Sequence, residues 1–391
     1  MPIHKKTIGI LGGGQLARML ALKARQMGLP TAVLSAKNTD PAARVASFWI
    51  KGNERSEKDI RLLLANSDIL TFESEFIPAF LLKRSLKSIP RKKVYPSLKC
   101  LGRLQDRLQQ KEWLCDYGLP TLDHIKINSK EDIFLAFEAF HHRLVLKRRT
   151  GGYDGYGTYI IKNIKQLNLF LKHFKGEENQ FIIEPFVDFQ SERSLIFARS
   201  ANGQIVQLPM IQSVQKNNQC DYTFGPTTHP LEKNLSLQIQ NFLRQVDYVG
   251  VIAFELFEVA TKTAKLLTSI SSNKNFVKTQ LVINEIAPRV HNTGHFSQEA
   301  LNIDQFELHL RCLLGLRLPE IHLRQPAFVM ANLLGQSTRK PLIKKFPTGA
   351  LHWYEKIENR KRRKMGHINY IGKNQKNLIH QALLERKGIL L

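Results

Sequence analysis

The chain has 391 residues, of which 43% are hydrophobic, so it is long and apolar enough for two or three domains with their own cores. No apolar run reaches the roughly 18 residues of a membrane-spanning helix, and the first residues lead directly into a strand pattern, so we expect neither a membrane segment nor a signal peptide. The four cysteines form no CxxC pair, which favours reduced thiols in the cytoplasm over a disulfide framework or a zinc site.

The formal net charge is +25, with 58 Lys and Arg residues against 33 Asp and Glu residues. Such basicity raises nucleic-acid binding as one hypothesis. The basic residues are spread along the chain, however, with their densest run at residues 360–364, and no zinc-finger spacing, aromatic RNA-binding signature or basic heptad region accompanies them. Diffuse positive charge equally suits an enzyme that acts on phosphorylated, anionic substrates.

Strand and helix patterns alternate over the first hundred residues. Apolar runs at Thr7–Leu11, Thr31–Leu34 and Ile69–Phe72 predict strands, and residues 16–27 have apolar side chains at helical spacing. This alternation predicts βαβ units and a parallel, Rossmann-like sheet.

The turn after the first strand has the pattern Gly12-x-Gly14-x-x-Ala17, which in this context is a candidate dinucleotide fingerprint. A nicotinamide site would also need an acidic residue at the end of the second strand to hold the ribose hydroxyls, and Ser35 stands there instead. We therefore expect no nicotinamide cofactor, although the backbone N–H groups at the start of the helix are suited to another phosphate.

An α+β pattern follows this first region. Residues Leu104–Tyr117 predict a helix, and runs at Leu144–Lys147, Tyr159–Ile161 and Phe181–Glu184 predict strands. The segment Thr150–Gly157 between the first two of these strands has four glycines within seven residues, which predicts a glycine-rich hairpin loop.

The rest of the chain predicts two further regions. A sheet is expected from about Ser194 to Gly315, with the polar segment Lys262–Lys278 forming a long exposed hairpin inside it. A small cap with short strands at Ala327–Met330 and His367–Tyr370 and a final helix is expected at the end. We find no internal repeats.

The strongest chemical signal is the stretch Asn284-Glu-Ile-Ala-Pro-Arg-Val-His-Asn-Thr-Gly-His295, which directly follows an apolar run. Glu285 is therefore expected at a strand end, and Glu255 ends a similar apolar run. Two glutamates on neighbouring strands suit a Mg²⁺ ion that is shared with substrate phosphates. The alternative interpretation is a pair of salt-bridged strand ends.

A phosphate site is indicated by the glycine-rich loop, because glycines let backbone N–H groups approach phosphate oxygens while Lys147 on the preceding strand supplies a positive charge. A glycine-rich loop alone also fits a plain flexible hairpin. The order of the loop and Lys147 followed by Glu184, Glu192, Glu255 and Glu285 is much more specific.

That order resembles the ATP-grasp superfamily and, within it, the family of 5-(carboxyamino)imidazole ribonucleotide synthases, the biotin-independent carboxylases of purine biosynthesis. The resemblance extends from Ile8 to about Tyr370. The motifs that carry it are Gly12-Gly-Gly-Gln-Leu-Ala-Arg-Met19, Thr71-Phe-Glu-Ser-Glu75, Gly151-Gly-Tyr-Asp-Gly155, residues 284–295, Gln305-Phe-Glu-Leu-His309 and Arg363-Lys-Met-Gly-His367.

The resemblance implies a fold and a chemistry. The fold would be an ATP-grasp fold of the α/β and α+β classes, with a Rossmann-like N-terminal domain at residues 1–103, an ATP-grasp domain at 104–318 with a lid at about 118–183, and a small C-terminal domain at 319–391. The reaction would be ATP- and bicarbonate-dependent carboxylation of 5-aminoimidazole ribonucleotide through carboxyphosphate, with release of ADP and phosphate, in the cytoplasm. Mg²⁺, or Mn²⁺ in its place, would assist, no biotin would be needed, and the enzyme would be a homodimer.

Two alternatives remain open. One is another ATP-grasp ligase, such as a formate-dependent ribonucleotide transformylase, although that family has His-Asp at the position of His291-Asn292 and Met at the position of His295. The other is a basic nucleic-acid-binding protein, which would show a steep dependence of its affinity on salt.

The resemblance also assigns roles to individual residues. ATP would be held by Arg107, Lys147, the loop Gly151, Gly152, Tyr153, Asp154, Gly155, Tyr156 and Gly157, the hinge Glu184, Pro185, Phe186 and Val187, and by Glu192, Gln215, Asn284 and Glu285. Mg²⁺ would be bound by Glu255 and Glu285. The carboxyl-transfer pocket would consist of Arg289, His291, Asn292, Tyr153 and Asp154, and the nucleotide substrate would contact Gln15, Glu73, Arg363 and Lys364.

The chain departs from the family pattern at three places. Tyr156 stands where a basic residue is usual in the loop, Gln215 stands where a histidine is expected, and the segment Lys262–Lys278 is longer than the usual hairpin. For His295, a turn histidine held by its neighbours and a catalytic histidine are both consistent with the sequence.

Overall fold

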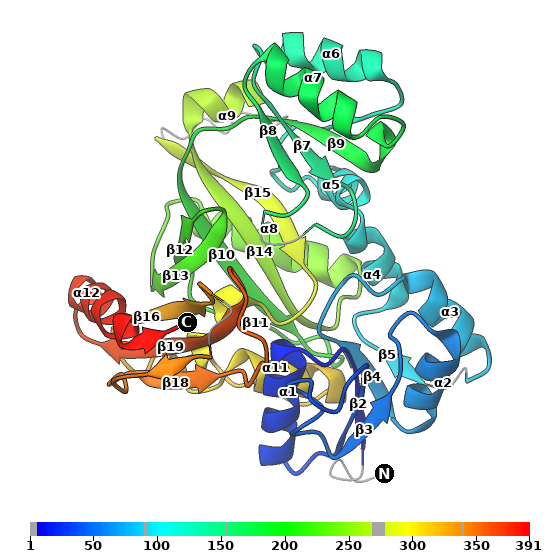
Figure 1. Ribbon diagram of the computed structural model, residues 1–391, viewed down its shortest axis with the longest axis vertical. Coiled ribbons are helices and arrows are strands. Elements are labelled where there is room, and N and C mark those ends of the chain that lie inside the picture. The colour runs from blue at the N-terminus through cyan, green and yellow to red at the C-terminus, as the bar shows by residue number, and fades with distance from the viewer. Residues whose placement is uncertain (1–5, 90–91, 153–154, 268–277, 338–339) are drawn as a thin grey trace.

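The computed structural model describes residues 6–89, 92–152, 155–267, 278–337 and 340–391 (Figure 1). Its N-terminal region is the predicted parallel sheet, with the strand order β3-β2-β1-β4-β5. The elements are β1 (Ile8–Leu11), α1 (Gln15–Gln26), β2 (Thr31–Ser35), β3 (Phe48–Lys51), α2 (Glu57–Ala65), β4 (Ile69–Phe72), α3 (Ala79–Lys87) and β5 (Lys93–Val94).

The sequence revealed only those strands of this sheet that are buried along their whole length. β1, β2 and β4 are fully buried, so they appear as continuous apolar runs. The sequence analysis missed β3, which is half-exposed at the edge of the sheet, and β5, which has only two residues.

The single helix predicted at Leu104–Tyr117 is wrong in its boundaries. The structure has two helices, α4 (Leu98–Gln105) and α5 (Arg107–Asp116). Asp106 separates them, because its backbone is extended and its carboxylate accepts a hydrogen bond from the N–H of Leu108 as the N-cap of α5.

A four-stranded antiparallel sheet, which we call the lid sheet, follows with the order β6-β9-β7-β8. Its strands are β6 (Ile125–Lys126), β7 (Leu144–Arg148), β8 (Thr158–Ile161) and β9 (Phe181–Pro185), and the helices α6 (Lys130–Ala139) and α7 (Ile164–His173) pack on it around a shared apolar core. The last three strands agree with the sequence prediction. The glycine-rich loop connects β7 to β8, which are paired as a hairpin.

The largest sheet contains nine strands, and eight of them follow the order β15-β14-β10-β12-β13-β16-β19-β18, while β11 pairs with β10. Its strands are β10 (Phe189–Arg199), β11 (Ile205–Gln207), β12 (Ile211–Lys216), β13 (Gln219–Gly225), β14 (Gly250–Ala260), β15 (Thr279–Ala287), β16 (Ala327–Leu334), β18 (Ala350–Trp353) and β19 (Lys364–Gly372). The associated helices are α8 (Glu232–Gln245), α9 (Thr261–Leu267), α10 (Ser297–Ala300), α11 (Gln305–Leu314) and α12 (Gln375–Glu385), and a short pair β17 (Leu342–Ile343) and β20 (Ile389–Leu390) stands apart.

Two expectations for this part of the chain need correction. The strands predicted for a C-terminal cap, β16 and β19, continue the large sheet by pairing with β13 and with each other. The segment Lys262–Lys278 does not begin as a hairpin, because Thr261–Leu267 forms α9, in which Ala264 packs against Val259 and Val282. Residues 268–277 of that segment lie outside the described residues. The predicted domain boundaries themselves stay predictions.

Apolar contacts join these regions into one body. α1 of the N-terminal region lies beside α11 (Figure 1), and its buried side chains belong to the same core as those of β10, β14 and α11. On the other side of the large sheet, Trp113 of α5 meets Phe242 of α8 edge-to-face, with ring centroids 5.2 Å apart. This contact fixes the helix that carries Arg107 over the sheet.

Replacement of Trp113 by alanine tests this packing. Trp113 is only 4% exposed, so its loss should lower the free energy of unfolding by about 3–5 kcal/mol. The matched control is Leu169→Ala on α7, a side chain that is 68% exposed and should change stability by less than about 0.5 kcal/mol. Urea unfolding followed by circular dichroism measures both, and equal stability of the two variants would contradict the packing described here.

Candidate functional site

One large cavity, of about 630 Å³, lies where the N-terminal region, the lid sheet and the large sheet meet. Most of the site residues predicted from the sequence line it, and they come from all three regions. These lining residues are Gln15, Glu73, Arg107, Lys147, Gly151, Gly152, Gly155, Glu184, Pro185, Phe186, Val187, Glu192, Gln215, Glu255, Asn284, Glu285, Arg289, His291, Asn292 and Lys364.

Three other predicted residues, all within the described part of the chain, are not among the lining residues. Tyr156 is 68% exposed at the tip of the glycine-rich loop, and Gly157 follows it. Arg363 turns to its own segment, where its Nη1 donates to the carbonyl of Glu358 at 3.0 Å. Tyr153 and Asp154 lie outside the described residues, so their predicted roles stay predictions.

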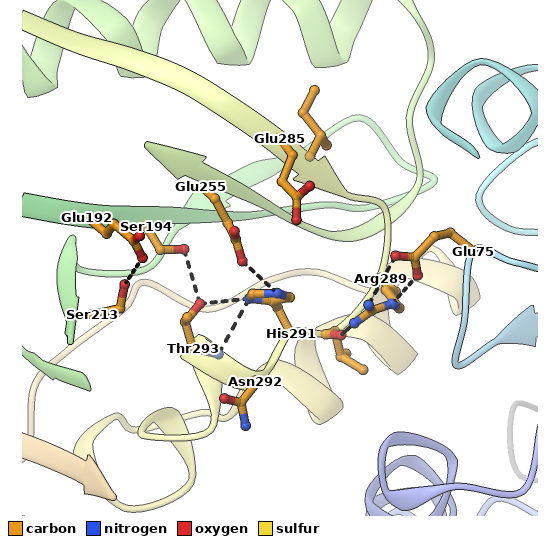
Figure 2. A network of polar contacts seen from close by, with 12 residues as sticks. Glu75, Glu192, Ser194, Ser213, Glu255, Glu285, Arg289, His291, Asn292 and Thr293 are labelled. Atoms are coloured by element: carbon orange, nitrogen blue, oxygen red, sulfur yellow. Dashed lines mark hydrogen bonds and ion pairs between the residues drawn. The ribbon is translucent and has the colours of Figure 1, made fainter. Parts of the chain in front are cut away.

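The two predicted metal ligands lie directly opposite each other on neighbouring antiparallel strands, Glu255 on β14 and Glu285 on β15. The prediction that they end their strands is wrong, since β14 continues to Ala260 and β15 to Ala287. Side chains that are opposite in an antiparallel pair share one face, with Cβ atoms about 5 Å apart. Both carboxylates therefore extend toward the side on which His291 and Arg289 lie (Figure 2).

Positive groups and hydrogen-bond donors offset the repulsion between these two carboxylates. The guanidinium of Arg107 lies 2.9 Å from Glu285, and Nε2 of His291 lies 3.1 Å from Glu255. Burial opposes ionisation of Glu285, but Arg107 and Lys147 hold its pKa below the usual carboxyl value. A pair of carboxylates of which one is held ionised in this way suits a hard divalent cation such as Mg²⁺.

Two lysines meet a carboxylate at the floor of the cavity. Glu184 of β9 lies 2.6 Å from the Nζ of Lys147 and 3.1 Å from the Nζ of Lys111. Burial opposes ionisation of Glu184, yet the two lysines lower its pKa to about 2. Lys147 also donates to the side chain of Asn284 at 2.7 Å, so it connects the lid sheet to β15. Lys111 was missed, because a lysine within a helix reads as a solvated residue.

Arg289 is held by a carboxylate from the N-terminal region. Glu75 follows β4 and accepts hydrogen bonds from Nε and Nη2 of Arg289, the latter at 3.1 Å (Figure 2). Burial disfavours the charged form of Arg289, but the carboxylate of Glu75 outweighs this effect and raises the pKa of Arg289 above its usual value. Glu75 was part of a recognised motif, but its role was not predicted, because nothing in the local sequence shows which partner a carboxylate will meet.

His291 has both ring nitrogens occupied. Nδ1 lies 2.8 Å from Oγ1 of Thr293 and accepts a hydrogen bond from the backbone N–H of Thr293 at 3.4 Å. The backbone N–H allows only an acceptor at Nδ1, so the ring proton lies on Nε2 and faces Glu255. The hydroxyl oxygens of Thr293 and Ser194 lie 3.1 Å apart, a contact that ties this histidine to β10.

Asn292 points away from Glu255 and His291 (Figure 2). Its side-chain amide forms two hydrogen bonds, of 2.9 and 2.8 Å, with the amide of Asn332 on β16. Asn332 also donates to the carbonyl of Cys220 at 2.9 Å. The pair therefore connects the segment 284–295 to the middle of the large sheet, a connection that no sequence pattern indicated.

Glu192 is a carboxylate with an unusual environment. It accepts a 2.6 Å hydrogen bond from Gln215 and lies near Ser213. Burial and the neighbouring charge of Glu255 raise its pKa to about 7. Gln215, the departure from the family pattern, therefore serves as a neutral donor to Glu192.

A carboxylate of the protein itself occupies part of the start of α1. The carboxylate of Glu73 accepts hydrogen bonds from the N–H groups of Gly14 at 2.5 Å and Ala17 at 3.1 Å. Burial raises the pKa of Glu73. Two of the N–H groups at the start of the helix therefore already have an acceptor, and a phosphate site there stays a prediction.

Apolar side chains form a further part of the cavity wall that the sequence analysis did not identify. The wall includes the stacked rings of Phe189 and Phe257, with centroids 4.5 Å apart, and it lies next to the predicted hinge. The other members are Leu122, Val145 and Ile160. Such a surface suits a flat aromatic base.

Models of known protein families match most of the chain. Residues 5–105 match the ribonucleotide synthetase preATP-grasp domain, residues 112–306 the ATP-grasp domain, and residues 328–381 the phosphoribosylaminoimidazole carboxylase C-terminal domain. The chain is 32% identical over 370 residues to the N5-carboxyaminoimidazole ribonucleotide synthase of Synechococcus elongatus, an alignment that covers 92% of this chain and 88% of that protein.

The chain belongs to the N5-carboxyaminoimidazole ribonucleotide synthase family. The family resemblance predicted from the sequence is thus confirmed.

Two further relatives support membership of this synthase family. The crystal structure of the Staphylococcus aureus N5-carboxyaminoimidazole synthetase complexed with ADP superimposes with a TM-score of 0.84 at 29% identity, and covers 98% of this chain and 97% of that one. The phosphoribosylaminoimidazole carboxylase of Candida glabrata is 30% identical over 390 residues, but this chain spans only 65% of its length. The predicted ATP-grasp fold is confirmed, and the chain is an ATP-binding member of this enzyme family.

The raised pKa of Glu192 predicts a dependence of stability on pH. Because the pKa in the folded chain is about 7 instead of 4.5, the contribution of Glu192 to stability is complete at low pH and is lost as the pH rises through 7. Glu192→Gln keeps the neutral form, so it should stabilise the ligand-free protein by up to about 3 kcal/mol at about pH 8 and leave it nearly unchanged at about pH 4.

Thermal unfolding at the two pH values measures this effect. Glu177→Gln, a change at an exposed carboxylate paired with Arg148, is the control and should show no such difference between the two pH values. If Glu192→Gln is equally stable to the wild type at both pH values, the environment assigned to Glu192 is wrong.

Proposed function

We propose that this chain catalyses the ATP- and bicarbonate-dependent carboxylation of 5-aminoimidazole ribonucleotide to N5-carboxyaminoimidazole ribonucleotide, with release of ADP and phosphate, in purine biosynthesis. Membership of the synthase family supports this activity and favours it over a formate-dependent transformylase or a nucleic-acid-binding protein. The activities of the relatives are properties of those proteins. The residues of the cavity are the reason for assigning this reaction to the present chain.

The observation that carries the proposal is the presence of three kinds of group in one cavity. A lysine and a glycine-rich loop suit the phosphates of ATP, two opposed glutamates suit a divalent cation, and Arg289 with His291 suits a small anion. Gln15 and Glu73 face the same cavity from the N-terminal region, so a second substrate can meet the activated anion there.

The first step activates bicarbonate. An oxygen of bicarbonate attacks the γ-phosphorus of ATP, the bond to ADP breaks, and carboxyphosphate forms. Lys147 and Arg107 compensate the charge of the phosphates, because phosphoryl transfer depends mainly on positioning and electrostatic stabilisation. Glu255 and Glu285 would hold Mg²⁺, or Mn²⁺ in its place, which when bound neutralises charge on the phosphate oxygens.

The second step transfers the carboxyl group. The amine of 5-aminoimidazole ribonucleotide attacks the carboxyl carbon, the bond to phosphate breaks, and the departing phosphate takes up the amine proton. Arg289 is held rigidly by Glu75, so it can stabilise the carboxylate without reorganising. His291 presents its Nε2 proton to the same region.

The proposal extends to location and assembly. Among the described residues, no helix has both the length and the apolar character needed to cross a membrane. We propose a cytoplasmic enzyme, in line with its four free cysteines, and a homodimer, by analogy with the family.

The proposed reaction predicts a specific dependence of ADP release on two substrates. Purified protein with Mg-ATP should release ADP faster when 5-aminoimidazole ribonucleotide is added, and this stimulation should require bicarbonate. Formate in place of bicarbonate is the control and should give no stimulation. A coupled spectrophotometric assay measures ADP, and stimulation by formate alone would assign the chain to a different reaction.

Replacement of a proposed metal ligand should abolish turnover. Glu285→Gln removes the charge that holds Mg²⁺, and this should lower the rate of ADP release by roughly 10²-fold or more. The matched control is Glu177→Gln, an exposed carboxylate outside the cavity, which should turn over at the wild-type rate. Near-wild-type turnover of Glu285→Gln at limiting Mg²⁺ would rule out a role for Glu285 as a metal ligand.

A further inference from the structure

Two buried glutamines form hydrogen bonds with the backbone of the segment 284–295, one at Ile286 and the other at His291. The side-chain amide of Gln110 on α5 accepts from the N–H of Ile286 at 2.8 Å and donates to its carbonyl at 3.1 Å. The amide of Gln305 on α11 does the same at His291, with both distances 2.8 Å. Ile286 follows Glu285 directly, and His291 contacts Glu255. The two pairs of hydrogen bonds therefore lie on either side of the residues assigned to the metal and the anion.

Gln110 supplies hydrogen bonds that a neighbouring strand would otherwise provide. β15 is the terminal strand of the large sheet, and its inner edge pairs with β14, where Ile286 is opposite Phe254. Within the described part of the chain, no strand pairs with the outer edge at Ile286. Gln110 pairs with that edge instead, and a second bond from its Nε2 to the carbonyl of Leu104 fixes the amide on the helix side.

Gln305 is fixed by a third partner, His295. Its Nε2 lies 2.9 Å from Nδ1 of His295 as well as 2.8 Å from the carbonyl of His291. Since an amide nitrogen only donates, Nδ1 of His295 must accept, and its ring proton lies on Nε2. All three contacts of Gln305 agree with one orientation of the amide, and a flipped amide would lose all three.

His295 therefore acts through Gln305. It is completely buried, its ring stacks on His367 with centroids 4.7 Å apart, and burial lowers its pKa well below the usual value, which keeps it neutral. Gly294 lets this group pack closely, because a Cβ atom there would lie 2.6 Å from Oε1 of Gln305. Of the two interpretations left open for His295, the structure supports the histidine held by its neighbours.

We infer that Gln110 and Gln305 are positioning residues that set the distance between the metal-binding carboxylates and the anion-binding residues by fixing the backbone at Ile286 and His291. The inference rests on the proposed function. Displacement of reacting groups by about 1 Å costs up to roughly 10²-fold in rate, so the loss of either pair of hydrogen bonds should be measurable.

The test compares Gln110→Met and Gln305→Met with a control of the same geometry. Methionine has a similar volume but cannot form the two amide bonds. Gln204 grips the backbone of Leu318 in the same way, with distances of 2.8 and 2.7 Å, and is not among the residues that line the cavity. Gln204→Met therefore removes an equivalent pair of bonds without touching the site.

We expect Gln305→Met to lower kcat for ADP release with 5-aminoimidazole ribonucleotide and bicarbonate by about 10- to 100-fold, with KM for ATP changed by less than about threefold. Gln110→Met should in addition raise the Mg²⁺ concentration for half-maximal rate, because it acts beside Glu285. Gln204→Met should keep the wild-type kcat, even if its melting temperature falls as far as the melting temperatures of Gln110→Met and Gln305→Met.

Gln305→Glu separates hydrogen bonding from volume. The glutamate has the same size and still accepts from the N–H of His291, but it places an oxygen against the carbonyl of His291 and Nδ1 of His295. Its kcat should fall by about as much as that of Gln305→Met. If Gln305→Met does not fold, Gln305→Glu serves as the test in its place. Wild-type kcat in Gln305→Glu, or an equal loss of kcat in Gln204→Met, would overturn the inference.

The failure of the proposed function would look different. In that case the wild-type protein itself would show no bicarbonate-dependent stimulation by 5-aminoimidazole ribonucleotide. The positioning role is then tested by the affinity for ADP, which calorimetry measures at increasing Mg²⁺ concentrations. Gln110→Met should need more Mg²⁺ than Gln204→Met for half-maximal affinity, and equal requirements would refute the positioning role.

Discussion

The antiparallel pairing of β14 with β15 is the constraint on which the site depends. It places Glu255 directly opposite Glu285, and two carboxylates at that separation repel each other unless positive charge lies close by. Arg107 and His291 meet one carboxylate each, and Lys147 reaches Asn284 beside them. The sheet register therefore dictates where the cations of the cavity must be, and the surrounding helices and loops supply them.

Each group that offsets the repulsion within this pair comes from a different part of the chain. Arg107 begins α5, Lys147 lies on the lid sheet, and His291 follows β15. The N-terminal region contributes through Glu75, which holds Arg289. The N-terminal region and α5 share apolar cores with the large sheet, so their packing fixes the groups that surround the carboxylate pair. The electrostatics of the site therefore depend on how several regions of the chain are placed together.

Much of this architecture was predictable, for physical reasons that also explain the failures. Buried strands such as β1 and β4 were found because a strand buried on both faces is a continuous apolar run, whereas β3 at the sheet edge was missed. The residues around Glu285 were found because several polar types cluster within twelve positions. Lys111, Glu75 and Gln110 were not assigned roles, because their partners lie far away in sequence and only the fold brings them together.

The interaction of Glu73 with the start of α1 has a consequence for ligand selection. In a dinucleotide-binding sheet, the glycines after the first strand make room for a diphosphate. Here a Cβ atom at either Gly12 or Gly14 would lie 2.7 Å from a carboxylate oxygen of Glu73, so the same glycines make room for a side chain of the protein. The N-terminal sheet thus carries an internal competitor for its own anion pocket. A dinucleotide that used these N–H groups would first have to displace a buried carboxylate, so the side chain of Glu73 opposes that class of cofactor on this sheet.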